Sequence, residues 1–167
     1  LDSGVASAAT SASAMEPLNL MPMPASVSRQ DGEFPINKQL HIEWSGYKDA
    51  LLVRAGERFL DRLNRRTGIV FVRSAPFANN DVLIIHSEGA DAAFLSLHAK
   101  ESYELEVRKN EIRLDAPGPT GILRGLATLI QMATQQRQGF SFPDVVIHDE
   151  PRFAWRGVMI DVSRHFM

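Results

Sequence analysis

The apolar residues of this chain are spaced for two amphipathic helices. Over residues 47–67 they recur every three or four positions along one face, at Leu52, Ala55, Phe59, Leu60 and Leu63. This spacing predicts a helix that buries one stripe, and Gly68 is a natural residue at its C-terminal end. A second helix is predicted to begin at Pro119-Thr120-Gly121, with Thr120 as its N-cap. Its buried stripe is predicted at Ile122, Leu126, Leu129, Ile130 and Ala133.

Shorter apolar stretches predict strands at residues 41–44, 69–72, 81–86 and 145–147. The continuous apolar run at 81–86 is typical of a strand that is covered on both faces. Residues 103–114 predict a hairpin in which Val107 faces Ile112 and Leu105 faces Leu114. Together these elements predict an α+β fold, with two helices packed on one face of a mostly antiparallel sheet.

The first fifteen residues differ from the rest because they are small, rich in Ala and Ser, and almost uncharged. Residues 1–15 have too little apolar mass to fold, so we expect a disordered leader followed by a domain over residues 16–150. Such a leader resembles what remains after removal of a signal peptide, which favours a periplasmic or secreted protein. A leader added for expression would have the same composition.

Composition narrows the classes of function. The 167 residues are 44% hydrophobic and 23% charged, as in soluble globular proteins, and no run of about 18 apolar residues indicates a membrane span. A net charge of −2 gives no electrostatic case for binding nucleic acid. The chain has no cysteine, and its five histidines lack metal-ligand spacing, so we expect neither a metal nor a cofactor.

The C-terminal stretch, residues 151–167, carries the most specific pattern. It reads Pro-Arg-Phe-Ala-Trp-Arg-Gly-Val-Met-Ile-Asp-Val-Ser-Arg-His-Phe-Met, and residues 153–162 predict a buried strand with Arg156 inside it. An arginine buried without a partner is costly. Arg156 should therefore pair either with a core carboxylate or with an anionic or multiply hydroxylated ligand.

This stretch resembles the opening of the catalytic barrel in family 20 of the glycoside hydrolases, the β-N-acetylhexosaminidases. Residues 121–131 also resemble the family's Gly-x-x-x-Gly-x-x-Thr-Leu-x-Gln helix. The resemblance implies that residues 151–167 begin a (β/α)8 barrel and that Arg156 hydrogen-bonds the 3- and 4-hydroxyls of a terminal N-acetylhexosamine. It matches Asp161, Arg164 and His165 to the same motif, and we expect these three to order the strand end rather than contact sugar.

The resemblance also implies where the chemistry lies. In this family an adjacent Asp-Glu pair is catalytic: the Glu protonates the glycosidic oxygen, and the Asp orients the 2-acetamido group that attacks the anomeric carbon. That pair lies far downstream in the barrel, whereas Asp149-Glu150 precedes the first barrel strand and is interpreted as structural. A (β/α)8 barrel needs about 250 residues, so the barrel is expected to be truncated here and the chain to hold no catalytic residue.

Two hypotheses follow for function. The first is the N-terminal part of an exo-acting, retaining β-N-acetylhexosaminidase that acts on the terminal N-acetylhexosamine of oligosaccharides or glycans, the fragment itself being inactive. The second is a free-standing, non-catalytic α+β interaction or carbohydrate-binding module. The segment around Arg156 favours the first, because a self-sufficient module has no use for an unpaired barrel strand. Such a strand is also expected to drive self-association.

Overall fold

The computed structural model describes residues 18–77, 81–94, 96–97 and 99–160. Along the chain these form β1 (Ser26–Ile36), β2 (His41–Gly46), α1 (Ala50–Thr67), β3 (Val82–Ser87), β4 (Tyr103–Val107), β5 (Glu111–Ala116), α2 (Pro119–Met132), β6 (Thr134–Gln136) and β7 (Gly139–Asp149). No helix in these ranges is long and apolar enough to cross a membrane.

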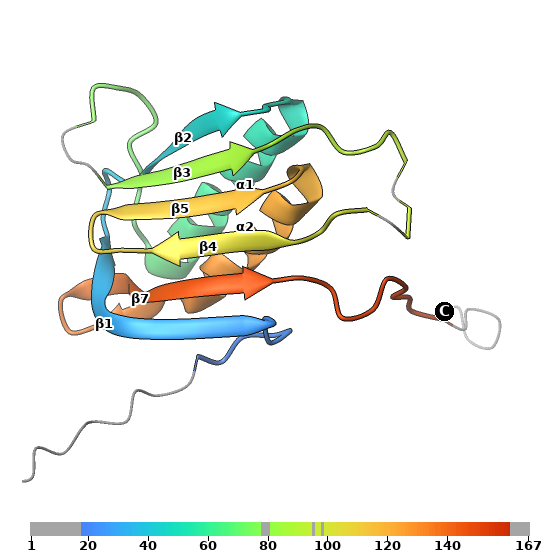
Figure 1. The fold of residues 1–167 in the computed structure, drawn as a ribbon. Helices are drawn as coiled ribbons and strands as arrows, with labels where there is room; N and C mark the ends of the chain where they lie inside the picture. Colours follow the sequence, from blue (N-terminus) through green and yellow to red (C-terminus); the bar gives the residue numbers. More distant parts are fainter. Residues whose placement is uncertain (1–17, 78–80, 95, 98, 161–167) are drawn as a thin grey trace, which may run out of the picture.

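The strands form a seven-stranded sheet in the order β1-β7-β4-β5-β3-β2, with β6 added alongside β7. Strand β3 pairs in parallel with β2 and β5, and the other pairs are antiparallel. Both helices lie on one side of this sheet (Figure 1). The predicted α+β architecture with two helices on one face is therefore confirmed.

Side-chain alternation explains which face the helices cover. In β4, Leu105 and Val107 are fully buried beneath the helices, whereas Glu104 points to the open face. The predicted hairpin register is confirmed, since Leu105 pairs with Leu114 and Val107 with Ile112. The apolar run of β3 is covered on one side only: Leu83 and Ile85 are fully buried, but Ile84 and His86 are half-buried because no helix lies over them.

Two predicted strands are wrong. Residues 69–72 form no strand: Phe71 is buried and Ile69 packs partly against the core, but Val70 is 77% exposed. Residues 153–160, the described part of the predicted strand 153–162, also form no strand and are exposed. Within the described ranges no neighbouring strand supplies a hydrogen-bonded ladder for either segment. Strand β1 was not predicted, because as an edge strand it buries little besides Phe34 and Ile36.

The caps of the two helices differ. Helix α1 ends at Gly68 as predicted, with a left-handed φ of 74°, and Asp49 caps its start by accepting from the Leu52 N–H at 2.8 Å. Thr120 is not the N-cap of α2, because Gly118 occupies that position. Instead the Asp91 carboxylate accepts from the Thr120 N–H at 2.7 Å and from its hydroxyl at 2.6 Å. A loop residue 29 positions earlier thus caps α2.

Helix α2 approaches the sheet closely through two glycines. A Cβ atom at Gly125 would lie 2.2 Å from Cδ1 of Leu114, and one at Gly121 would lie 2.3 Å from the Ser102 carbonyl oxygen. One turn further along the same face, the Thr128 and Tyr103 hydroxyls are 2.6 Å apart. Only a helix without side chains at these two positions can lie this close to β4 and β5.

We expect Gly121→Ala to lower the free energy of unfolding by about 1–3 kcal/mol, as overpacking does, despite a gain of up to ~1 kcal/mol in helix propensity. The clash is with a backbone carbonyl, which cannot move aside cheaply. Urea unfolding followed by circular dichroism measures the change. Gly89→Ala is the matched control, because a Cβ there meets no atom within 4 Å. Equal stability of the two variants would contradict the close approach.

Candidate functional site

Glu101 is the residue that connects the domain to the segment carrying Arg156. It lies two residues before β4, and its Oε2 atom accepts from Nε of Arg124 on α2 at 2.9 Å and forms an ion pair with Nη2 of the same arginine, also at 2.9 Å. Its Oε1 atom accepts from Nη2 of Arg156. The Glu101 side chain is only 15% exposed, whereas Arg156 is 44% exposed. One partly buried carboxylate thus holds two guanidinium groups.

The charge of Glu101 is stabilised by these partners. Burial of the carboxylate acts to raise its pKa, but hydrogen bonds and charge from Arg156 and Arg124 outweigh that effect, and the pKa of Glu101 is lowered. Glu101 is therefore ionised at neutral and mildly acidic pH, where both ion pairs are intact.

The structure shows one of the two partners that the sequence allowed for Arg156. Its guanidinium contacts the Glu101 carboxylate, and its Nη1 donates to the Phe153 carbonyl oxygen at 2.7 Å. The partner is thus a carboxylate at the domain edge rather than within a buried strand. Contact with sugar hydroxyls stays a prediction. Asp161, Arg164 and His165 lie outside the described residues.

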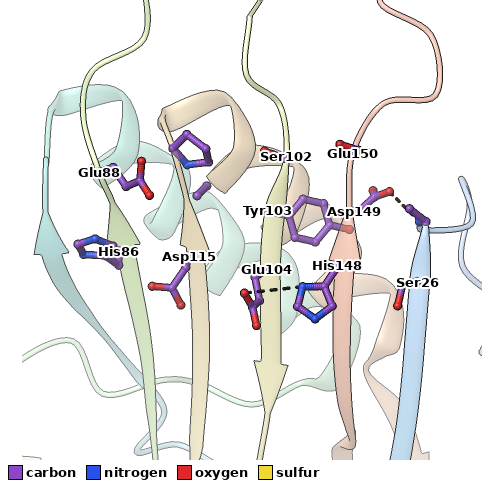
Figure 2. A pocket seen from close by; sticks show the side chains of 13 residues that line it. Ser26, His86, Glu88, Ser102, Tyr103, Glu104, Asp115, His148, Asp149 and Glu150 are labelled. Atoms are coloured by element: carbon purple, nitrogen blue, oxygen red, sulfur yellow. Dashed lines mark hydrogen bonds and ion pairs between the residues drawn. The ribbon is translucent and has the colours of Figure 1, made fainter.

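A cleft of about 440 Å³ lies at the end of the sheet where β1 and β4 begin and β3, β5 and β7 end (Figure 2). Five acidic side chains and two histidines are among the residues that line it: Glu88, Glu104, Asp115, Asp149, Glu150, His86 and His148. Glu104 and His148 point toward each other from neighbouring strands, with Oε2 and Nδ1 3.7 Å apart. This pair is half-exposed, so solvent screens it strongly.

The Asp149-Glu150 pair lines this cleft, and its structural interpretation stays a prediction. Asp149 Oδ1 accepts from the backbone N–H of Ala25 at 3.0 Å, which ties the start of β1 to the end of β7. His86 Nδ1 lies 3.2 Å from the Ser45 hydroxyl. Among the described residues, no group of three or more His, Cys, Asp or Glu side chains could hold a metal ion.

Comparison with known proteins identifies the family. Residues 17–150 match the family model described as glycosyl hydrolase family 20, domain 2. The chain belongs to glycoside hydrolase family 20. In the solved chitobiase of Flavobacterium johnsoniae, 39% identical with a TM-score of 0.77, the match covers 89% of this chain and 23% of that one. The family resemblance of the sequence is thus confirmed.

Other family 20 relatives are hexosaminidases. The β subunit of rat β-hexosaminidase is 33% identical over 128 residues, which cover 74% of this chain and 24% of the relative. Subunit A1 of the Dictyostelium discoideum enzyme is 29% identical over 157 residues, covering 91% and 28%. The chain therefore spans about a quarter of the length of these two relatives, both of which are named as subunits of β-hexosaminidase.

Glu101 was not identified as a site residue from the sequence. It stands in a Glu-Ser-Tyr sequence before a hairpin, and nothing local distinguishes it from the other acidic residues on exposed strand faces. Its partners are 23 and 55 residues away. No local signal in the sequence connects Glu101 with either arginine.

The buried Tyr103 gives the domain a characteristic response to alkali. Burial, together with the nearby Asp149 carboxylate, raises the pKa of its hydroxyl to about 12, although the Thr128 hydrogen bond acts to lower it. An unfolded tyrosine titrates near pH 10, so the folded state is favoured by the neutral Tyr103 hydroxyl to the full extent below about pH 10, and this contribution is lost as the pH rises toward 12.

From about pH 9 to about pH 11.5, we expect the free energy of unfolding to fall about 2 kcal/mol more in the wild type than in Tyr103→Phe. Urea unfolding of both proteins at a series of pH values measures this difference. If the unfolding free energies of the two proteins changed in parallel with pH, the prediction would be contradicted.

Proposed function

We propose that this chain is the N-terminal part of an exo-acting β-N-acetylhexosaminidase that releases terminal GlcNAc or GalNAc from oligosaccharides or glycans. One observation carries the proposal: the match of residues 17–150 to domain 2 of the family is followed at once by the Arg156-Gly157 segment, which resembles the family's first barrel strand. A relative solved with N-acetylglucosamine, an exo-β-N-acetylglucosaminidase from Vibrio harveyi, is 26% identical with a TM-score of 0.67. The Ala/Ser-rich composition of residues 1–15 supports export to the periplasm or beyond.

The exposed segment 151–160 supports a catalytic barrel as the continuation of this domain. It presents five large apolar side chains to solvent, at Phe153, Trp155, Val158, Met159 and Ile160. Apolar side chains gathered in this way mark a surface that other polypeptide covers. In the enzyme we propose, neighbouring barrel strands cover them. A free-standing module would leave them exposed, and self-association through this segment is then the expected outcome.

The proposed chemistry is retaining and substrate-assisted. A Glu of an adjacent Asp-Glu pair in the barrel protonates the glycosidic oxygen, and the Asp orients the 2-acetamido group, whose carbonyl attacks the anomeric carbon in place of an enzyme nucleophile. In this proposal Asp149-Glu150 is not this pair, because it precedes the segment that resembles the first barrel strand, whereas the family's pair lies far downstream of that strand. In this proposal Arg156 binds substrate, and the 167-residue chain itself supplies no catalytic group.

We expect the purified 167-residue chain not to hydrolyse aryl β-N-acetylglucosaminides above background, because the acid that protonates the leaving group is absent from it. Release of the aryl chromophore over hours at micromolar protein measures this. Turnover that persists after a second, independent purification would contradict the proposal that the catalytic pair lies in the barrel and outside this chain.

In the complete enzyme, we expect Arg156→Ala to lower kcat/KM by at least ~100-fold, because two charge-assisted hydrogen bonds of about 1.5–3 kcal/mol each are lost. Steady-state kinetics with an aryl substrate measure the loss. Arg152→Ala is the matched control, since Arg152 is an exposed arginine of the same segment. Near-normal kinetics for Arg156→Ala would restrict Arg156 to its ion pair with Glu101.

A further inference from the structure

The Glu101 carboxylate joins two parts of the molecule that are distant in sequence. One oxygen accepts from Nε of Arg124 on the exposed side of α2 and lies 2.9 Å from its Nη2, and the other accepts from Nη2 of Arg156 in the exposed segment 151–160. Within the described residues, the Arg156 side chain contacts residues 18–150 through Glu101. The position of its guanidinium relative to this domain therefore depends on one carboxylate.

We propose that Glu101 is a positioning residue for Arg156: it fixes the guanidinium against the N-terminal domain so that its remaining donors are presented to substrate hydroxyls. This inference rests on the proposed function, in which Arg156 binds sugar. It adds to that function a residue of the N-terminal domain that touches no substrate.

Glu101 can do this because it is itself held rigidly. Its side chain is only 15% exposed, and one of its oxygens lies 2.9 Å from both Nε and Nη2 of Arg124. Arg124 lies between Gly121 and Gly125, the two positions at which α2 has no room to shift on the sheet. A carboxylate fixed in this way orients its second guanidinium partner at little further entropic cost.

Arg156 retains donors for a ligand while it is held. A guanidinium has five N–H groups, and within the described ranges two of them are engaged, one with Glu101 and one with the Phe153 carbonyl. Three donors remain on a side chain that is nearly half-exposed. A guanidinium held in a fixed plane can donate to two neighbouring hydroxyl oxygens at once, whereas a freely rotating guanidinium loses conformational entropy when it binds them.

The first test uses this 167-residue chain and needs no activity. Heteronuclear ¹⁵N NOEs report the order of the backbone at residues 153–157. We expect Glu101→Gln to lower these NOEs toward those of a free terminus, because the neutral amide holds Arg156 more weakly. Glu111→Gln is the matched control, since it removes a carboxylate paired with Arg113 at the protein surface. Arg156→Gln breaks the same contact from its exposed side without threatening the fold, and we expect the same loss.

The second test uses the complete enzyme and separates positioning from stability. We expect Glu101→Gln to raise KM about 10-fold with kcat within about threefold, because a weaker grip on Arg156 costs ground-state and transition-state binding alike. Glu101→Asp, which keeps the charge, should recover part of the loss. A residue that merely stabilises the fold would lower the active fraction, and hence kcat, without changing KM.

The two proposals fail in different ways. If Arg156→Ala leaves kcat/KM unchanged, the sugar-binding role of Arg156 is wrong. If Arg156→Ala abolishes activity but Glu101→Gln changes neither KM nor the order of residues 153–157, only the positioning role is wrong. Unchanged NOEs in both Glu101→Gln and Arg156→Gln would also overturn it.

Discussion

The close contact of α2 with β4 and β5 is the constraint on which the rest of this domain depends. It exists because Gly121 and Gly125 present no side chain where the helix meets Leu114 and the Ser102 carbonyl. The same contact brings the Thr128 and Tyr103 hydroxyls together beneath the helix. It allows little sliding or rotation of α2, so every other residue of that helix has a defined place relative to the sheet.

The electrostatics of the site follow from that placement. The Arg124 side chain extends from α2 to Glu101. A carboxylate that is covered to this extent would be costly to ionise without a positively charged partner. Two guanidinium groups offset the cost, and the second belongs to Arg156 in the exposed segment. A packing constraint in the core thus sets the position of a charged group at the edge of the domain. We propose that the catalytic barrel begins at that edge.

Features that depend on local periodicity could be predicted from the sequence. The spacing of apolar residues predicted the two helices, the buried stripe of α1, most of the buried stripe of α2 and the register of the β4–β5 hairpin, because each is decided by residues close together in the sequence. Features that depend on distant partners could not. The cap of α2 comes from Asp91, the segment 153–160 lacks a strand to pair with, and Glu101 acquires its role only from Arg124 and Arg156. The family motif identified the helix but not the physical reason for its glycines.

The most direct test of the account is a crystal structure of the complete enzyme with N-acetylglucosamine bound. The account predicts that the Arg156 guanidinium lies within hydrogen-bonding distance of hydroxyls of the terminal sugar while the Glu101 carboxylate still contacts it. A bound sugar with Arg156 turned away from it, or an Arg156 that reaches the sugar only after leaving Glu101, would contradict it.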